Sequence, residues 1–238
     1  MSAHEAGDGA RPPADVIAAL GRIFPAGIAT AALAADATPA ELSEIESQAG
    51  AHYSGSRLHH YALGRACARL ALRELTGGES CIGMLPGGAP AWPDGIIGSI
   101  SHSRLWVAAA AAHAGAIQDI GIDVEDATRH SVRLERWACT AAERTRLRDL
   151  PVPDGSSGWS TVVFSAKEAV YKAVNPSTGI PLRFHDVELD FDTAARTYVV
   201  RVVRAIDGPS EWVTRLKGRY EVVHGAVLSS AILHAERA

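Results

Sequence analysis

The spacing of apolar and polar residues along this chain of 238 residues predicts an alternation of helices and strands. Residues 14–22 are expected to form a first short helix, and residues 56–76 a long one. The long helix has Leu63, Cys67 and Leu70 on its apolar face, and a pair of glycines follows its last residue. Such a helix is long enough to cover one face of a sheet.

Two Thr-x-x-Glu sequences predict helix starts of the capping-box type, in which the threonine and glutamate side chains each accept a hydrogen bond from a backbone N–H. In the first, Thr38 is the cap, Pro39 suits the first helical position and Glu41 completes the box. In the second, Thr140 and Glu143 begin the next helix.

Strands are predicted where apolar and β-branched residues cluster between turn-forming residues. The expected strands are residues 27–35, 96–102, 105–113, 120–127, 186–191, 197–205, 219–223 and 225–234. The last four follow a helix over about residues 159–174 and are expected to form a meander. Residues 79–98 and 152–158 are expected to be loops, because glycine and proline are frequent in them.

The two parts of the chain look alike at three pairs of positions that are 102 residues apart. The pairs are Thr38 and Thr140, Glu41 and Glu143, and Arg65 and Lys167. We therefore expect an α+β protein of two similar halves, residues 14–117 and 118–238, after a flexible lead-in of residues 1–13. A ligand would bind in the cleft between such halves.

Composition narrows the class of protein. The chain is 47% hydrophobic and 21% charged, as packed globular proteins are, and its net charge of −4 argues against a general nucleic-acid-binding protein. No apolar run is long enough to span a membrane, and the N-terminal residues lack the apolar core of a signal peptide. Three cysteines without metal-binding spacing predict reduced thiols, so we expect a cytoplasmic protein.

Two acidic residues interrupt the apolar strand sequence IGIDVEDA. Asp123 and Glu125 lie two positions apart and project from the same face of the strand, whereas Ile122 and Val124 project from the other. This pair is compatible with a solvated sheet face, and equally with two oxygen ligands for a hard cation such as Mg²⁺.

The helix sequence FSAKEAVYKA adds Glu168 and, one turn later, Lys172. A third carboxylate would fit a magnesium shell that phosphate oxygens and water complete, and Glu168 could also accept a proton from a hydroxyl. The alternative is an exposed ion pair between Glu168 and Lys172, which would contribute only about 0.3–0.5 kcal/mol.

Arginine and histidine side chains supply candidate anion-binding groups. Arg65, Arg69 and Arg73 repeat every four residues and form one stripe, which is either a solvated helix face or a phosphate clamp. In the segment GSISHS, Ser101 offers a hydroxyl and His102 an imidazole, with a histidine in a turn as the alternative.

Four segments, in this order, resemble the motifs of 4′-phosphopantetheinyl transferases. They are GRACARLAL at 64–72, GGAPAWPDGIIGSISHS at 87–103, GIDVE at 121–125 and FSAKEAVYKA at 164–173. The combination of G-I-D-V-E with F-S-x-K-E-x-x-x-K is the most diagnostic part. The resemblance covers about residues 50–190 and is nearest to the enterobactin synthase component D type of the Sfp-like class.

The resemblance implies a fold of two α+β halves related by pseudo-twofold symmetry, with coenzyme A between them. It implies a holo-[acyl-carrier-protein] synthase type of enzyme, which moves the 4′-phosphopantetheine arm of coenzyme A to a serine of an apo acyl or peptidyl carrier protein. The implied second product is 3′,5′-adenosine bisphosphate, and the implied metal is Mg²⁺, with Mn²⁺ as a substitute. Relatives serve siderophore, nonribosomal-peptide or polyketide synthases and are usually monomers.

The same resemblance implies roles for the acidic residues and the lysine. Asp123, Glu125 and Glu168 match the family's acidic triad, which holds Mg²⁺ on the pyrophosphate of coenzyme A. Glu168 is the candidate base for the carrier serine. Lys172 matches the lysine that contacts the pyrophosphate and steadies the leaving group, so it has both a binding and a catalytic role.

The remaining matched residues are implied to hold the nucleotide. Ser101 and His102 match a pair beside the nucleotide, with His102 at the 3′-phosphate. Arg57 and Arg65 match the basic pair near the phosphate of the adenine nucleotide. Arg69 is a less certain member of this group, and Arg73 is expected at the surface.

The sequence departs from the family pattern in two places. No Lys or Arg lies between Arg73 and Arg104, where many relatives carry a basic residue that helps to hold the 3′-phosphate. Either coenzyme A is held less tightly, or another group such as His59 or His60 takes part. His60 and Tyr61 themselves stand where relatives usually carry Glu and Phe.

Carrier proteins are typically acidic near their serine, so the face that binds them should be apolar with some positive charge. Residues 128–150 are the predicted face, and an exposed charged helix pair is the alternative. Its arginines are Arg129, Arg133, Arg136, Arg144 and Arg146. Two other functions stay open: a metal-dependent nucleotide pyrophosphohydrolase that uses the same acids with water, and a non-catalytic carrier-binding module.

Overall fold

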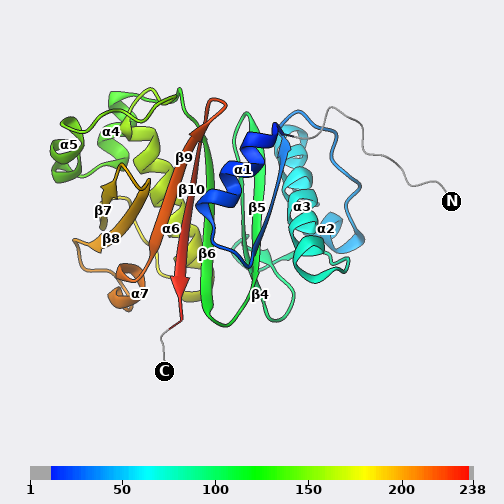
Figure 1. Cartoon of the computed structure of the whole chain (residues 1–238). Helices are drawn as coiled ribbons and strands as arrows, with labels where there is room; N and C mark the ends of the chain where they lie inside the picture. The colour runs from blue at the N-terminus through cyan, green and yellow to red at the C-terminus, as the bar shows by residue number, and fades with distance from the viewer. Residues whose placement is uncertain (1–11, 236–238) are drawn as a thin grey trace.

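The computed structural model describes residues 12–235, which form two larger antiparallel sheets and a two-stranded pair, with helices packed on the sheets (Figure 1). In chain order the elements are α1 (Ala14–Ile23), β1 (Ile28–Ala34), α2 (Glu44–Ala49), α3 (Gly55–Thr76), β2 (Gly83–Met84), β3 (Pro90–Ala91), β4 (Ile96–His102), β5 (Trp106–His113), β6 (Ile117–Asp126), α4 (Val132–Ala138), α5 (Ala141–Arg148), α6 (Trp159–Thr178), β7 (Val187–Asp192), β8 (Thr197–Val202), α7 (Ser210–Thr214), β9 (Lys217–Val223) and β10 (Ala226–His234). The α+β class is therefore confirmed.

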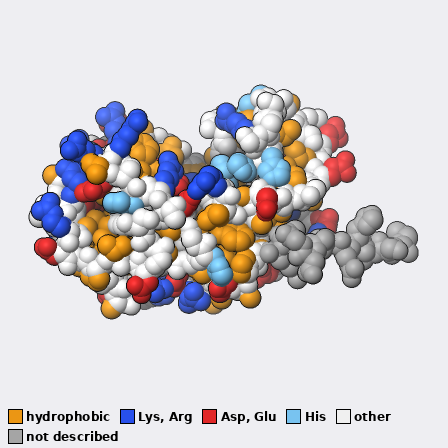
Figure 2. Space-filling model, turned by 90° about the horizontal axis from the view of Figure 1, so that it is seen from above, with side chains coloured by type: hydrophobic (Ala, Val, Ile, Leu, Met, Phe, Trp, Pro, Cys, Tyr) orange, Lys and Arg blue, Asp and Glu red, His pale blue; other side chains and the backbone are white. Residues whose placement is uncertain are grey.

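The strands form a three-stranded sheet in the order β1-β5-β4 and a five-stranded sheet in the order β6-β10-β9-β8-β7. The predicted meander of the last four strands is confirmed, and β10 returns to pair with β6. The expected loop at 79–98 contains the short pair β2 and β3. Seen from above, the surface is hollowed by a notch between two parts of the molecule (Figure 2).

The two larger sheets meet where β4 lies beside β6. The contact is made by side chains, since Ser99 Oγ accepts a hydrogen bond from the backbone N–H of Ile122 at 3.1 Å and Ser101 Oγ accepts one from that of Val124 at 3.2 Å. Serine hydroxyls thus satisfy N–H groups of β6 that have no neighbouring strand on this side. This junction places the ends of β4 and β6 together.

Small residues let the helices approach the sheets closely. Helix α3 packs on the three-stranded sheet through Leu63 and Cys67, against the buried alanines of β5. Gly121 of β6 lies under α6, where a Cβ atom would come within 1.9 Å of the carbonyl oxygen of Ala169. Glycine is therefore required at this position for α6 to lie against the strand that carries the two acids.

Helix α1 covers the opposite face of the five-stranded sheet. Leu20 and Ile23 pack with Ile122 and Val124, and Ser230 Oγ donates a hydrogen bond to the carbonyl oxygen of Ile23 at 2.6 Å. This helix belongs to the first part of the chain yet packs on strands of the second. The division at residues 117 and 118 stays a prediction, and residues 1–11 of the expected lead-in lie outside the described part.

The first predicted capping box is wrong. Helix α2 begins five residues later than expected, with Ser43 as its cap and Glu46 completing the box. Glu41 is exposed, whereas Glu46 is fully buried and accepts hydrogen bonds that Glu41 could not reach from the surface. The box at Thr140 and Glu143 is confirmed as the start of α5. The offset of 102 residues is therefore wrong for the first two pairs.

The correct box reveals a repeated contact pattern. Glu46 accepts from the backbone N–H of Ser43 and Ile82 and pairs with Arg69. Glu143 accepts from the backbone N–H of Thr140 and Leu189 and pairs with Lys167. Arg69, not Arg65, is thus the counterpart of Lys167. The repeat supports two similar halves, while the pseudo-twofold symmetry stays a prediction.

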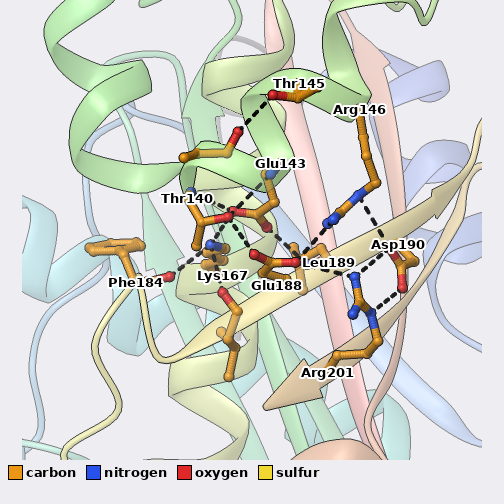
Figure 3. A network of polar contacts seen from close by, with 12 residues as sticks. Thr140, Glu143, Thr145, Arg146, Lys167, Phe184, Glu188, Leu189, Asp190 and Arg201 are labelled. Atoms are coloured by element: carbon orange, nitrogen blue, oxygen red, sulfur yellow. Dashed lines mark hydrogen bonds and ion pairs between the residues drawn. The ribbon is translucent and has the colours of Figure 1, made fainter. Parts of the chain in front are cut away.

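Lys167 of α6 is surrounded by oxygen atoms in the protein interior (Figure 3). Its ammonium group donates to Glu143 Oε2 at 2.7 Å and to three backbone carbonyl oxygens, those of Ala138 at 2.9 Å, Phe184 at 2.7 Å and Val187 at 2.9 Å. The side chain is 1% exposed. Lys167 therefore fastens α6 to α5 and to the segment before β7.

The three cysteines are free thiols, as the sequence predicts. Burial raises the pKa of the Cys67 and Cys139 thiols to about 12, so both stay protonated at neutral pH. Within residues 12–235, no helix has the length and apolar content needed to cross a membrane.

We expect Lys167→Met to lower the free energy of unfolding by about 3–5 kcal/mol, because it leaves the Glu143 carboxylate buried without its cation. Urea unfolding measures this loss. The control is Lys217→Met, which removes an exposed lysine. A difference between the two variants of less than about 1 kcal/mol, the usual worth of a surface pair, would contradict the structural role of Lys167.

A pH-dependent effect is expected at Asp119 of β6, where burial raises the carboxyl pKa from 3.8 to about 6. The folded state then holds the proton more tightly than the unfolded state, so stability falls as pH rises from about 4 to about 6. Asp119→Asn should therefore raise the free energy of unfolding by about 2 kcal/mol at pH 8 and hardly at all at pH 4. Equal changes at both pH values would contradict this interpretation.

Candidate functional site

The candidate residues converge where β4, β6 and α6 meet. The alternation predicted for β6 is confirmed, since Ile122 and Val124 are buried in the core under α1, while Asp123 projects from the opposite face toward α6. Ser101 comes from the end of β4, next to β6. The short distance between strand and helix, set by Gly121, brings Lys172 of α6 to Asp123.

Asp123, Ser101 and Lys172 form a hydrogen-bonded triangle. Asp123 Oδ1 accepts from Ser101 Oγ at 2.9 Å and from Lys172 Nζ at 2.7 Å, and Lys172 also donates to Ser101 Oγ at 2.8 Å. The second oxygen of Asp123, Oδ2, is buried and has no hydrogen-bond partner among residues 12–235. A buried carboxylate oxygen without a partner is costly and indicates a ligand position.

Lys172 therefore pairs with Asp123, and no salt bridge within the described residues joins it to Glu168. This excludes the exposed ion pair that the sequence left as an alternative. Its side chain is 26% exposed and that of Asp123 is 4% exposed. A half-buried ammonium group of this kind can still reach a ligand that approaches from solvent.

Glu125 and Glu168 are half-buried beside this triangle. Burial raises the pKa of each carboxyl group, and the charge of Asp123 raises both further. Arg129 and Lys172 act in the opposite direction, and Arg129 forms an ion pair with Glu125 at 2.9 Å. The charge of Asp123 thus acts on both glutamates, which fits carboxylates gathered around a cation site.

The donor set fits a hard divalent cation, because three carboxylates and a buried unpartnered oxygen are available. No three acidic, histidine or cysteine side chains of residues 12–235 already converge as a complete metal site. A cation here would need oxygens from its substrate and from water to complete its shell, as Mg²⁺ does when it binds phosphates. The metal-binding roles of Asp123, Glu125 and Glu168 stay predictions.

The arginine stripe of α3 is largely used inside the protein. Arg65 is 4% exposed, donates to the carbonyl oxygen of Gly83 at 2.9 Å and lies over the ring of Tyr61. Arg69 pairs with buried Glu46, and Arg73 pairs with Glu79 at the surface. Arg69 and Arg73 are therefore engaged in ion pairs, whereas Arg65 keeps a buried Nε atom without a hydrogen-bond partner among the described residues, and its contact with the nucleotide stays a prediction.

The other predicted nucleotide contacts lie near the start of α3 and the end of β4. Arg57 is exposed and its guanidinium lies 4.5 Å from the centre of the Tyr53 ring. His102 keeps part of its surface in solvent, and its ring centre is 4.9 Å from that of His60. Partial removal of its ring from water lowers the pKa of His102, and the positive charges of His60 and Lys172 lower it further.

Sequence reasoning missed an aromatic pocket beside Glu168. The cavity has a volume of about 200 Å³ and is lined by Glu168, Tyr171, Leu182 and Phe184, among others. Phe184 stacks on Phe164, and Trp137 lies against both rings. Phe184 belongs to the segment IPLRFHDVEL, in which a Pro and a Phe precede a strand. The sequence does not show which aromatic rings Phe184 contacts after folding.

The predicted carrier face divides into two parts. Arg146 pairs with Glu188 and Asp190 (Figure 3). Arg144 donates to the carbonyl oxygen of Cys139, so both arginines are used inside the fold. On α4, Arg133 and Arg136 are exposed and form no ion pair with another described residue.

On either side of the two α4 arginines in the sequence, Val132 is 62% exposed and Trp137 is 53% exposed. A hollow of about 440 Å³ runs beside them, lined by Arg129, Ser131, Arg133, Leu134 and Trp137. The apolar and positively charged character predicted for the face is therefore concentrated on α4.

Comparison with known proteins identifies the family. The sequence model of the 4′-phosphopantetheinyl transferase N-terminal domain matches residues 46–112, and that of the 4′-phosphopantetheinyl transferase superfamily matches residues 119–227.

Similarity to individual proteins of known name points to the same family. The chain is 36% identical over 184 residues to the 4′-phosphopantetheinyl transferase Svp of Streptomyces mobaraensis, covering 75% of this chain and 73% of the relative. It is 33% identical over 188 residues to PptT of Mycobacterium tuberculosis, covering 74% and 79% of the two chains. Enterobactin synthase component D of Salmonella typhimurium is 36% identical over 129 residues, 52% and 51% of the two chains. The chain therefore belongs to the 4′-phosphopantetheinyl transferase superfamily and is an enzyme of this type.

Proposed function

We propose that this enzyme transfers the 4′-phosphopantetheine arm of coenzyme A to a carrier-protein serine in a Mg²⁺-dependent reaction that releases 3′,5′-adenosine bisphosphate. Family membership supplies coenzyme A as substrate and a carrier protein as acceptor. The observation that carries the rest is Asp123, whose one oxygen is held by Lys172 and Ser101 and whose other oxygen is buried without a partner. Siderophore, nonribosomal-peptide and polyketide carriers are the proposed acceptors.

Each polar group of the site has a task in this reaction. Lys172 carries positive charge beside Asp123 and can turn to the pyrophosphate, whose charge increases as the nucleotide leaves. Asp123, Glu125 and Glu168 would hold Mg²⁺, which when bound neutralises charge on the pyrophosphate. Glu168 is half-buried beside Asp123 and is the proposed acceptor of the serine proton.

The surroundings suggest where the two substrates lie. The aromatic pocket beside Glu168, lined by Tyr171, Leu182 and Phe184, is the proposed place for the apolar part of the pantetheine arm. The α4 surface of Val132, Arg133, Arg136 and Trp137 is the proposed carrier-binding face, since its charge complements an acidic carrier and its tryptophan can be buried on binding.

We expect Glu168→Gln to reduce the rate of carrier modification at least 100-fold, because the variant keeps the size of the side chain but cannot take up the serine proton. Intact-protein mass spectrometry of an apo carrier incubated with enzyme, coenzyme A and Mg²⁺ measures the gain of one phosphopantetheine arm. A chelator should abolish the gain. The matched control is Glu74→Gln on the exposed side of α3, which should keep full activity.

Two results of that experiment would contradict the proposed function. Coenzyme A cleaved with no carrier modified would indicate a pyrophosphohydrolase. Coenzyme A bound but never consumed, across peptidyl, polyketide and fatty-acid carriers, would indicate a binding module. Either result separates the transferase from the alternatives without reference to any variant.

Substitutions on α4 should act on the carrier alone. Arg133→Glu and Arg136→Glu are each expected to raise KM for the carrier protein about tenfold or more, because a charge complementary to the acidic carrier is lost. KM for coenzyme A should not change. Arg148→Glu on neighbouring α5, which changes an exposed arginine away from this surface, is the control. Equal effects of all three variants would show that overall charge, and not this face, matters.

A further inference from the structure

One serine of strand β10 is buried without a hydrogen-bond partner. Ser229 is completely removed from solvent, and its Oγ atom has no partner among residues 12–235. The next residues on the same face of the strand, Val227 and Ala231, belong to the apolar core under α6. A hydroxyl in such an apolar row costs free energy unless it donates to an acceptor, so we looked for an acceptor that faces it.

The strand register places Ser229 directly opposite Asp123. Strands β10 and β6 are antiparallel, with Ser229 opposite Asp123 and Leu228 opposite Val124. Directly opposed residues of such a pair project from the same face, with their Cβ atoms about 4.5–5.5 Å apart. Leu228 and Val124 pack in the core cluster of α1, so Ser229 and Asp123 share the other face, toward α6.

The two side chains lack complementary groups. Oδ1 of Asp123 is held by Ser101 and Lys172, whereas Oδ2 is a buried acceptor without a partner in the described part of the chain. Ser229 offers a buried donor on the opposed position. A serine hydroxyl can take three staggered positions without movement of the backbone. One hydrogen bond would satisfy both atoms, each of which otherwise carries the cost of burial without a partner.

Other unpartnered hydroxyls on this side of the sheet have acceptors in their own helix. Thr161 and Ser165 of α6 are also buried without a partner within residues 12–235. A helical hydroxyl can turn to a carbonyl oxygen three or four residues earlier. Ser229 has no such local acceptor, because β10 pairs with β6 on one side and β9 on the other (Figure 1). Hydrogen bonds to a carboxylate are also stronger than those to a hydroxyl, which favours Asp123 as its acceptor.

A bond from Ser229 leaves Asp123 able to bind a cation. Each carboxylate oxygen has two lone-pair sites, so Oδ2 can accept one hydrogen bond and still ligate a metal ion. Carboxylates that ligate metals are commonly hydrogen-bonded themselves, which fixes their orientation. Ser101 and Lys172 do this at Oδ1, and Ser229 would do it at Oδ2 from the protein interior.

We propose that Ser229 is a positioning residue, whose hydroxyl donates to Asp123 Oδ2 and orients this carboxylate for the divalent cation. The inference rests on the proposed function, because it takes Asp123 as a ligand of that cation. Ser229 touches neither the cation nor the substrates. It acts through Asp123, from a strand that lies outside the four sequence motifs of the site.

The first test measures Mn²⁺ binding by electron paramagnetic resonance. The full-length enzyme is titrated in the presence of coenzyme A, and Mn²⁺ bound by coenzyme A alone is subtracted. Ser229→Ala should raise the Kd for Mn²⁺ about tenfold, as loss of a hydrogen bond to a metal ligand does. Ser229→Thr keeps the hydroxyl and should bind Mn²⁺ more tightly than Ser229→Ala.

The matched control is Ser230→Ala at the next position of β10. Ser230 is equally buried, but it projects from the opposite face and donates to the carbonyl oxygen of Ile23. Its loss should lower resistance to urea and leave the Kd for Mn²⁺ unchanged. A wild-type Kd in Ser229→Ala, or equal weakening of Mn²⁺ binding by both alanine variants, would overturn the inference.

Urea unfolding with a chelator present tests the same bond without the cation. Ser229→Ala should lower the unfolding midpoint, because it leaves Asp123 Oδ2 without its donor. In the Asp123→Ala background the same substitution should have no such effect, since the acceptor is already gone. A hydroxyl without any partner predicts an unchanged or higher midpoint in Ser229→Ala, and that result would reject the bond.

The wild-type measurements judge the proposed function separately. A wild type that binds no Mn²⁺ with coenzyme A would reject the metal-dependent transfer and, with it, the role of Ser229. A wild type that binds Mn²⁺ and modifies the carrier, with Ser229→Ala unchanged in both tests, would leave the transferase standing and reject Ser229 as a positioning residue.

Discussion

The buried ion pair of Lys167 and Glu143 is the constraint on which the geometry of the site depends. Both side chains are almost completely removed from solvent, and every polar atom of the pair has a partner: three backbone carbonyls around the ammonium group and two backbone N–H groups at the carboxylate. Buried pairs of this kind contribute little net stability compared with apolar residues, but loss of one partner leaves an uncompensated buried charge. Because four oxygens from three segments surround the Lys167 ammonium group, they restrict the rotation of α6 about its axis.

That rotation decides what Glu168 and Lys172 can reach. Successive residues of a helix are about 100° apart around its axis, so fixing Lys167 toward α5 turns the next residue to an adjacent face, and Lys172 follows on the same side one turn later. Gly121 sets the distance, since any larger residue would displace α6 from β6. One structural lysine and one glycine thus position the groups that act on the substrate, although neither touches it in the proposed mechanism.

The first half also contains a buried glutamate that completes a capping box and pairs with a cation of a long helix. Glu46 is buried at the start of α2, with its capping box and with Arg69 as its cation, and this holds α3 against its sheet. Of the stripe that could bind phosphate, Arg69 is neutralised by Glu46, whereas Arg65 donates only to a backbone carbonyl and keeps a buried Nε atom without a partner among the described residues. The same kind of buried carboxylate thus decides which arginine of α3 serves the fold.

This division explains what the sequence could and could not predict. The alternation of Asp123 and Glu125 with Ile122 and Val124 depends only on the period of a strand, and it was correct. The role of the arginine stripe depends on Glu46, which lies 23 residues before Arg69 in the chain and meets it only after folding.

The choice between two possible capping boxes was decided in the same way. Ser43 and Glu46 form the helix start because the Glu46 carboxylate finds the N–H of Ile82 and the guanidinium of Arg69 inside the protein. Thr38 and Glu41 have an equally good local sequence but no such partners. Local pattern therefore determines which face a residue occupies, and tertiary pairing determines whether a charge on that face serves the fold or remains available for a ligand.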